Sequence, residues 1–234
     1  MSTIFIPPCE NGRRLVISDI HGCKRSFKAL IQKVSLRKED QLFLLGDYIN
    51  KGPDSLGVIK YILSLQEKGY QIFPLRGNHE ENLLEANQNA HTLYSFLIDQ
   101  NSTDLLNDEG QLRKKVLRFI KQLPYYYQLE EYILVHAGLN FNIDKPYTDI
   151  YSILNIRDFP IDKKKLKGKR IIHGHNPKPL HIIEEAYKKK HTVIPLDNGC
   201  VFKGFREHLG NLLCLDLTNW ELAIQTNIEK LKYS

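Results

Sequence analysis

Apolar residues in the first half of the chain form short continuous runs that alternate with segments of helical spacing. The continuous runs, each of a length suited to a buried strand, lie at residues 14–18, 41–45 and 70–75. Segments 24–34 and 55–68 separate them. The first places apolar side chains on one face, as an amphipathic helix does, and the second follows the N-cap residue Asp54 and stops at Gly69. This alternation predicts βαβ units whose strands pair in a largely parallel sheet.

The pattern changes towards the middle of the chain. Residues 80–122 have helical spacing, with an apolar stripe through Leu112, Val116, Phe119 and Leu123. After Pro124, β-type runs return at residues 125–129, 132–135, 170–172, 193–196 and 212–217. We therefore expect a two-layer or sandwiched α/β domain whose second half is richer in antiparallel strands. Because no linker or repeat interrupts the chain, residues 1–234 are predicted to form a single domain with a helical insert at about 81–123.

Composition narrows the class of protein. The chain has 234 residues, of which 42% are hydrophobic, and this is enough to bury a core without disulfide bonds or structural metal ions. No apolar run approaches the ~20 residues that span a bilayer, and residues 1–10 do not resemble a secretory signal. The scattered cysteines favour reduced thiols in a cytoplasmic protein; they are Cys9, Cys23, Cys200 and Cys214. The net charge of +6 suits phosphorylated partners. Because no aromatic residues interleave with the lysines at 163–165, dedicated nucleic-acid binding is not expected.

Acidic, histidine and amide side chains follow the predicted strands at the points where these end. The set comprises Asp19, His21, Asp47, Asn78, His136 and His175. Asp19 and His21 lie two positions apart, so in extended backbone both side chains point to the same side. Because ligand sites in open α/β sheets lie at such strand ends, we expect the six side chains to form one site.

The donor types in this set indicate a metal centre. Oxygen and imidazole ligands without sulfur suit manganese, iron or zinc, whereas magnesium accepts fewer histidines. The Asp47 carboxylate has two oxygens and could bridge two cations. The alternative is that these residues are turn residues and surface histidines, which are common after strands. His136 argues against it, because it follows an apolar run that should be buried and precedes the small residues Ala137 and Gly138.

These segments resemble the motifs of the phosphoprotein phosphatase family of metallophosphoesterases, and the resemblance extends over most of the chain. The motifs read Ser18-Asp19-Ile20-His21-Gly22, Gly46-Asp47-Tyr48-Ile49-Asn50-Lys51-Gly52, Gly77-Asn78-His79-Glu80, His136-Ala137-Gly138 and Gly174-His175-Asn176-Pro177. The third is the most specific. The likeness is strongest to small bacterial and phage serine/threonine protein phosphatases, such as that of phage lambda, and to symmetrical diadenosine tetraphosphatases.

The resemblance implies a calcineurin-like fold, in which a β-sandwich of mixed sheets is flanked by helices and the active site lies in loops at the carboxyl ends of strands. It assigns Asp19, His21 and Asp47 to a first metal ion. It assigns a second ion to Asp47, Asn78, His136 and His175, with Asp47 shared. Two such cations, manganese first and iron or zinc as alternatives, would hold a bridging hydroxide that attacks phosphorus directly.

The resemblance also assigns His79 as the general acid, with a merely structural histidine as the alternative. The sequence departs from the family's motif at two positions, because Asn50 and Lys51 stand where the family usually has Asp and Arg. Asn50 can orient His79 but brings no charge, and Lys51 offers phosphate a point charge instead of a bidentate fork. Arg157 is the remaining phosphate-binding candidate, together with Asn78; the alternative for Arg157 is a surface ion pair with Asp158 or Asp162.

The sequence thus predicts a metal-dependent phosphatase that hydrolyses phosphomonoesters. Phosphoserine and phosphothreonine on proteins are the first expectation. A symmetrical diadenosine tetraphosphatase, or an enzyme for another small phosphorylated metabolite, is the alternative, and the insert at 81–123 would decide between them. A non-catalytic phosphate-binding relative is a second alternative, because Asn50 and Lys51 depart from the motif. The sequence gives no indication of the oligomeric state.

Overall fold

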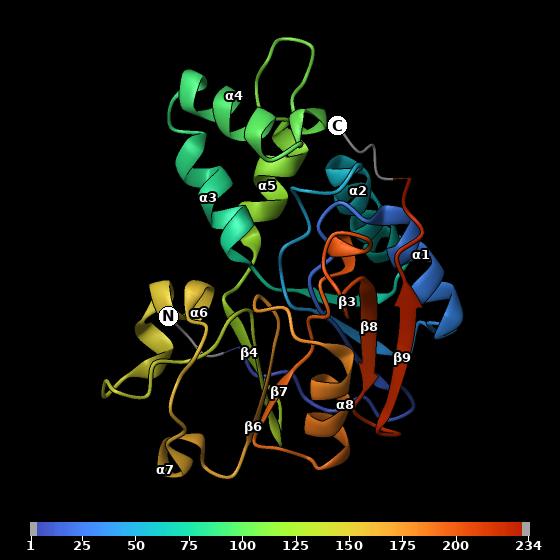
Figure 1. Ribbon diagram of the computed structural model, residues 1–234, viewed down its shortest axis with the longest axis vertical. Helices are drawn as coiled ribbons and strands as arrows, with labels where there is room; N and C mark the ends of the chain where they lie inside the picture. The colour runs from blue at the N-terminus through green and yellow to red at the C-terminus, as the bar shows by residue number, and fades with distance from the viewer. Residues whose placement is uncertain (1–3, 231–234) are drawn as a thin grey trace.

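The computed structural model describes residues 4–230 and contains two mixed β-sheets (Figure 1). The five-stranded sheet has the order β3-β2-β1-β8-β9, and the four-stranded sheet the order β4-β5-β6-β7. The first sheet consists of β1 (Arg14–Ile17), β2 (Gln41–Leu44), β3 (Gln71–Pro74), β8 (Asn211–Asp216) and β9 (Glu221–Thr226). The second consists of β4 (Tyr126–Gln128), β5 (Tyr132–Val135), β6 (Arg170–His173) and β7 (Val193–Pro195).

Helices surround these sheets. They are α1 (Lys24–Lys33), α2 (Ser55–Glu67), α3 (Asn78–Ala86), α4 (Ala90–Asp99), α5 (Lys114–Gln122), α6 (Ile150–Asn155), α7 (Lys163–Leu166) and α8 (Leu180–Lys188). Three short 3₁₀ turns lie at Thr103–Leu105, Pro146–Thr148 and Cys200–Phe202. Asp54 caps α2 by accepting a hydrogen bond from the N–H of Gly57, as its place before the helix suggests. Within residues 4–230, no helix is long and apolar enough to cross a bilayer.

Alternation along the strands buries both faces of the first sheet. In β1, Val16 faces the second sheet and packs in a cluster with Leu134 and Ile172. Its neighbours Leu15 and Ile17 point the other way, into the cluster formed with α1 and α2. A third cluster covers the outer face of the second sheet with α6 and α7. The result is a sandwich of two sheets between helices, which confirms the expected fold class.

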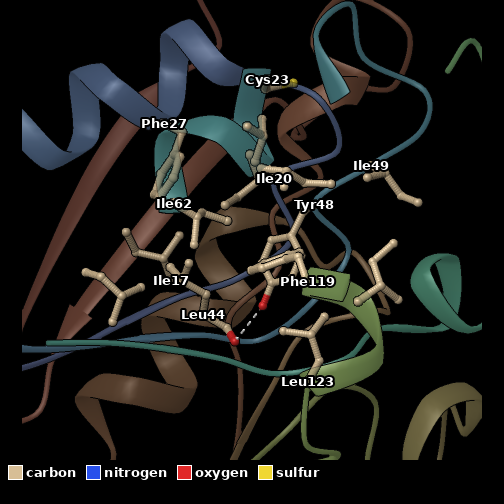
Figure 2. Packing of buried hydrophobic residues seen from close by; sticks show 14 of the residues in the cluster. Ile17, Ile20, Cys23, Phe27, Leu44, Tyr48, Ile49, Ile62, Phe119 and Leu123 are labelled. Carbon is tan, nitrogen blue, oxygen red and sulfur yellow. Dashed lines mark hydrogen bonds between the residues drawn. The ribbon is translucent and has the colours of Figure 1, made fainter. Parts of the chain in front are cut away.

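The helical insert begins earlier than predicted, because α3 starts at Asn78 itself. In Figure 1, α3, α4 and α5 project from one end of the sandwich. Figure 2 shows how α5 joins the core: Phe119 lies against Tyr48, with ring centroids 5.8 Å apart. The hydroxyl of Tyr48 donates to the carbonyl oxygens of Leu44 and Leu75 at 3.2 and 2.7 Å. This buried tyrosine therefore fixes the loop after β2, which carries Asp47.

The second half differs in detail from the prediction. Both β5–β6 and β6–β7 are parallel, while the antiparallel pairs are β4–β5, β1–β8 and β8–β9. The strand β9 and the helices α6, α7 and α8 were not predicted. The lysines at 163–165, which we named only as an argument against nucleic-acid binding, lie in the helix α7. The four cysteines are free thiols, and three of them are buried.

Candidate metal centre and active site

Ends of strands from both sheets meet at one edge of the sandwich. Asp19 and His21 follow β1, Asp47 follows β2, and Asn78 opens the helix after β3. His136 and His175 follow β5 and β6 of the second sheet. The site is therefore built across the sandwich, from loops at the carboxyl ends of parallel strands. Backbone strain is concentrated here, because five non-glycine residues have φ between 45° and 73°: His21, Asp47, Asn50, Lys51 and His175.

Asp47 lies at the centre of the donor atoms. Its Oδ2 is 3.5 Å from Nε2 of His21 and 3.9 Å from Nε2 of His79, while its Oδ1 is 3.6 Å from Nε2 of His136. Two groups have donor atoms that all lie within 4.8 Å of one another: His21, Asp47 and His79, and Asp47, His136 and His175. Asp47 belongs to both groups, as a bridging ligand would, whereas the first group contains His79 in place of the predicted Asp19.

The imidazole rings are oriented as metal ligands usually are. Nδ1 of His21 lies 3.0 Å from the carbonyl oxygen of Ile49, and Nδ1 of His136 lies 2.8 Å from that of Leu45. Because a carbonyl can only accept, each Nδ1 carries the proton and each Nε2 presents a lone pair to the centre.

On the second-metal side, acceptor atoms face one another. Oδ1 of Asn78 lies 2.9 Å from Nε2 of His136 and 3.0 Å from Nδ1 of His175. Acceptor atoms at such distances need a proton or a metal ion between them, and the oxygen and imidazole donors of this set fit a divalent cation. Burial opposes protonation of His136, yet the Asp47 and Asp19 carboxylates raise its pKa above the usual value. The same two carboxylates would attract a divalent cation at this place.

The first-metal side is arranged differently. Asp19 belongs to neither compact donor group. Its carboxylate accepts hydrogen bonds from the Ser18 hydroxyl at 2.7 Å and from the backbone N–H of His175 at 3.1 Å. Nε2 of His21 lies 2.9 Å from the ammonium nitrogen of Lys51. The residues present thus fit a metal here less completely than on the second side.

Glu80, to which sequence reasoning gave no role, holds the loop of Asp47 in place. Its fully buried carboxylate accepts hydrogen bonds from the backbone N–H groups of Asp47, Tyr48 and Gly77 at 2.9, 2.8 and 2.9 Å. Burial, with the nearby Asp47 carboxylate, raises the pKa of Glu80 to about 7. Gly77 makes the close approach possible, because a Cβ there would lie 2.2 Å from Oδ1 of Asp47. The position of Glu80 in the third motif was the signal for this role.

Asn50 contacts His79 as the sequence suggested, through its amide nitrogen. Nδ2 of Asn50 lies 2.8 Å from Nδ1 of His79, and Oδ1 of Asn50 accepts from the Ser102 hydroxyl at 2.8 Å. Nδ1 of His79 is therefore the acceptor, which leaves the proton of the neutral ring on Nε2, towards Asp47. Burial is the main cause that lowers the pKa of His79. No sequence signal pointed to Ser102.

Arg157 is exposed in the loop after α6 and makes no ion pair within the described part of the chain, so the alternative of a surface pair with Asp158 or Asp162 is not seen. Its carbonyl oxygen accepts from the amide of Asn176 at 3.1 Å, and this ties the loop to the segment of His175. A Cβ at Gly138 would lie 2.2 Å from the Phe159 ring, so this glycine admits the Arg157 loop beside His136. The pKa of His175 is lowered mainly by burial and by the charge of His136. The Arg157 guanidinium is close enough to add a smaller lowering effect.

The sequence profile of the calcineurin-like phosphoesterases matches residues 12–215. The chain belongs to this family. The symmetrical bis(5'-nucleosyl)-tetraphosphatase of Nitrosomonas europaea is 30% identical over 172 residues, which cover 68% of this chain and 59% of that protein. Its counterpart in Buchnera aphidicola is 38% identical over 98 residues, or 39% of this chain and 35% of that protein. This chain thus spans between about a third and three fifths of the length of these symmetrical relatives.

One relative matches over most of its length. The asymmetrical bis(5'-nucleosyl)-tetraphosphatase PrpE of Geobacillus sp. (strain WCH70) is 30% identical over 220 residues, which cover 81% of this chain and 86% of that protein. Among solved structures, a candidate diadenosine tetraphosphatase aligns with a TM-score of 0.67 at 21% identity, over 97% of this chain and 99% of that one. A serine/threonine phosphatase of Saccharomyces cerevisiae aligns with a TM-score of 0.63 at 16% identity, over 99% and 85%. At these identities, the structures show the fold alone.

Membership in the family confirms that the chain is a phosphoesterase and implies divalent metal ions. The first expectation from sequence was too specific, since the named relatives are nucleosyl tetraphosphatases and the likeness to protein phosphatases is one of fold. The assignment of individual ligands and catalytic residues, and the identity of the metal, stay predictions.

Proposed function

We propose that this protein hydrolyses bis(5'-nucleosyl) tetraphosphates symmetrically, to two nucleoside diphosphates. The proposal rests on the sequence similarity of this chain to proteins named as bis(5'-nucleosyl)-tetraphosphatases. The Nitrosomonas and Geobacillus proteins, which match the larger part of this chain, are both bis(5'-nucleosyl)-tetraphosphatases. The symmetrical mode rests on the Nitrosomonas and Buchnera proteins.

The residues of the site suit this chemistry. Asp47, Asn78, His136 and His175 would hold one divalent cation, and Asp19 and His21 would complete the position of a second with Asp47. When bound, such cations activate water and neutralise charge on phosphoryl oxygens. The remaining charge of a polyphosphate would be met by Lys51, at the centre, and by the exposed Arg157, at its rim.

His79 would supply the proton that the leaving diphosphate needs. Its Nε2–H points towards the centre, because Asn50 donates to Nδ1. A nucleoside diphosphate is a better leaving group than the hydroxyl of serine. It therefore demands less of its general acid, and an acid oriented by a neutral amide is adequate for it.

The protein-phosphatase activity that the sequence first suggested has support of a coarser kind. It rests on motifs shared across the superfamily and on the fold of the yeast enzyme at 16% identity. A serine or threonine alkoxide would need a stronger acid at His79 than Asn50 supports.

Side-by-side kinetics test the proposal. With manganese present, we expect kcat/KM for diadenosine tetraphosphate to exceed that for a phosphothreonine peptide at least ~100-fold. The variant His79→Asn should slow both reactions, while His91→Asn, at an exposed position of α4, should slow neither. A preference for the phosphopeptide would overturn the proposal.

A further inference from the structure

Lys51 directs its ammonium group into the proposed metal centre. Nζ lies 2.9 Å from Nε2 of His21 and 5.5 Å from the centroid of the Phe202 ring. The backbone holds the residue in place, because its N–H donates to the carbonyl oxygen of Gln100 at 2.8 Å and its φ is 65°. The side chain is half-buried. Its direction is therefore set by the loop and by the aromatic ring beside it.

The contact uses the one lone pair that His21 can offer. Nδ1 of His21 carries its proton, because it faces the carbonyl oxygen of Ile49 at 3.0 Å. Nε2 is thus the only ligand atom of this ring, and the Lys51 ammonium donates to it. One lone pair cannot accept an N–H and coordinate a metal ion at the same time. The ammonium and a first metal ion therefore compete for His21.

In the described part of the chain, the second-metal side has no such competitor. The donor atoms of Asn78, His136 and His175 face one another at 2.9 and 3.0 Å, and no lysine or arginine of residues 4–230 is among their hydrogen-bond partners. On the first side, the Asp19 carboxylate is also occupied by the Ser18 hydroxyl and the His175 N–H. Two independent contacts thus distinguish the two positions.

We propose that Lys51 is an internal cation at the first metal position, which makes the two positions unequal and couples the first to substrate. The enzyme without substrate binds one divalent ion tightly, at Asp47, Asn78, His136 and His175. A phosphoryl group draws the ammonium of Lys51 away from His21 and so frees Nε2 for the second ion. By linkage, that ion strengthens phosphate binding by the same factor. The inference rests on the proposed metal centre and on phosphate binding there, and it holds for any phosphoester substrate.

Calorimetric titration of the metal-free protein with manganese tests the inference. We expect one tight ion and a second bound at least ~10-fold more weakly; inorganic phosphate should bring the two affinities closer together by a similar factor. The variant Lys51→Met should bind the second ion at least ~10-fold more tightly than the parent, without phosphate. Lys51→Arg should retain the inequality, and Lys60→Met, on the exposed surface of α2, controls for the loss of one positive charge.

Two equal ions in the parent protein would overturn the inference, as would an unchanged second affinity in Lys51→Met. If that variant does not fold, the parent titrated with and without phosphate decides alone: no effect of phosphate on the second ion contradicts the coupling. The titration is independent of the tetraphosphatase assignment, because it measures metal binding and not turnover. Loss of activity on diadenosine tetraphosphate would leave its result standing.

Discussion

The side-chain amide of Asn50 donates to His79, with Nδ2 of Asn50 2.8 Å from Nδ1 of the ring. The Ser102 hydroxyl fixes this orientation by donating to Oδ1 of Asn50. A carboxylate in the same place would accept from a protonated Nδ1 and stabilise the imidazolium, whereas the amide stabilises the neutral ring. The exchange of one atom thus weakens His79 as an acid while it keeps the ring in position.

Replacing Asn50 by Asp should therefore strengthen the acid. We expect hydrolysis of an alkyl phosphate, with its poor leaving group, to be accelerated roughly tenfold, and that of p-nitrophenyl phosphate less than about twofold. Steady-state kinetics on the two substrates measure the difference. Asn142→Asp, at an exposed loop position, is the matched control. Equal acceleration of both substrates would show that Asn50 acts on something other than the leaving group.

Glu80→Gln should destabilise the loop of Asp47. A glutamine offers one acceptor oxygen where the carboxylate accepts three backbone N–H groups. With a buried donor left unpaired, the free energy of unfolding should fall by about 2–4 kcal/mol, as measured by urea denaturation. Manganese affinity should fall with it, about 10–100-fold. Glu85→Gln, exposed on the same helix, should change neither quantity. Unchanged stability in Glu80→Gln would contradict the account of this carboxylate.

His136→Ala should remove the tighter metal ion. The variant loses the Nε2 that faces both Asn78 and Asp47. We expect less than one tightly bound manganese per chain by equilibrium dialysis and a fall in kcat of at least ~1,000-fold. His181→Ala, at an exposed position of α8, serves as the control. Full metal content in His136→Ala would show that the ion binds elsewhere.

The ionised carboxylate of Asp40 should make the free energy of unfolding depend on pH. Burial alone would raise the pKa of this fully buried carboxyl, but hydrogen bonds from Arg13 and Arg37 lower it well below its usual value. A lowered folded-state pKa contributes stability above the unfolded value of about 3.9, and this contribution is lost as pH falls below it. Asp40→Asn should therefore cost about 2–4 kcal/mol at pH 7, and the gap to the parent should narrow below about pH 4.

Urea denaturation at a series of pH values measures this gap. Asp108→Asn, at an exposed position of the loop before α5, is the control and should show no gap at any pH. A gap between Asp40→Asn and the parent that stays constant from pH 7 down to pH 3 would contradict the role of the ionised carboxylate.

Much of the fold could be predicted, because local patterns of apolar and polar residues indicate where its strands lie. The runs that became β1, β2 and β3 are short and apolar, and each is followed by a polar loop. The strand β9 escaped prediction because it is an edge strand of partly exposed residues in which only three consecutive positions, 222–224, are apolar. The helix α8 was missed although Ile183 and Ala186 form a buried face, since neighbouring polar residues obscure its spacing.

The site was predictable as a set of residues and less so as a geometry. Asp47, His136 and His175 could be placed together because each follows a strand end. The direction of Lys51 and the hydroxyl of Ser102 could not, since both depend on contacts between loops far apart in sequence. Ser102 lies 52 positions from Asn50, and no local pattern links the two.

The most direct test of the central claim is chromatography of the products that the manganese-loaded protein forms from diadenosine tetraphosphate. We predict adenosine diphosphate as the sole nucleotide product, with two molecules formed for each substrate molecule consumed. The variant His79→Asn should form it much more slowly. Adenosine triphosphate together with adenosine monophosphate would contradict the symmetrical mode. Intact tetraphosphate, under conditions in which a phosphopeptide is dephosphorylated, would contradict the assignment itself.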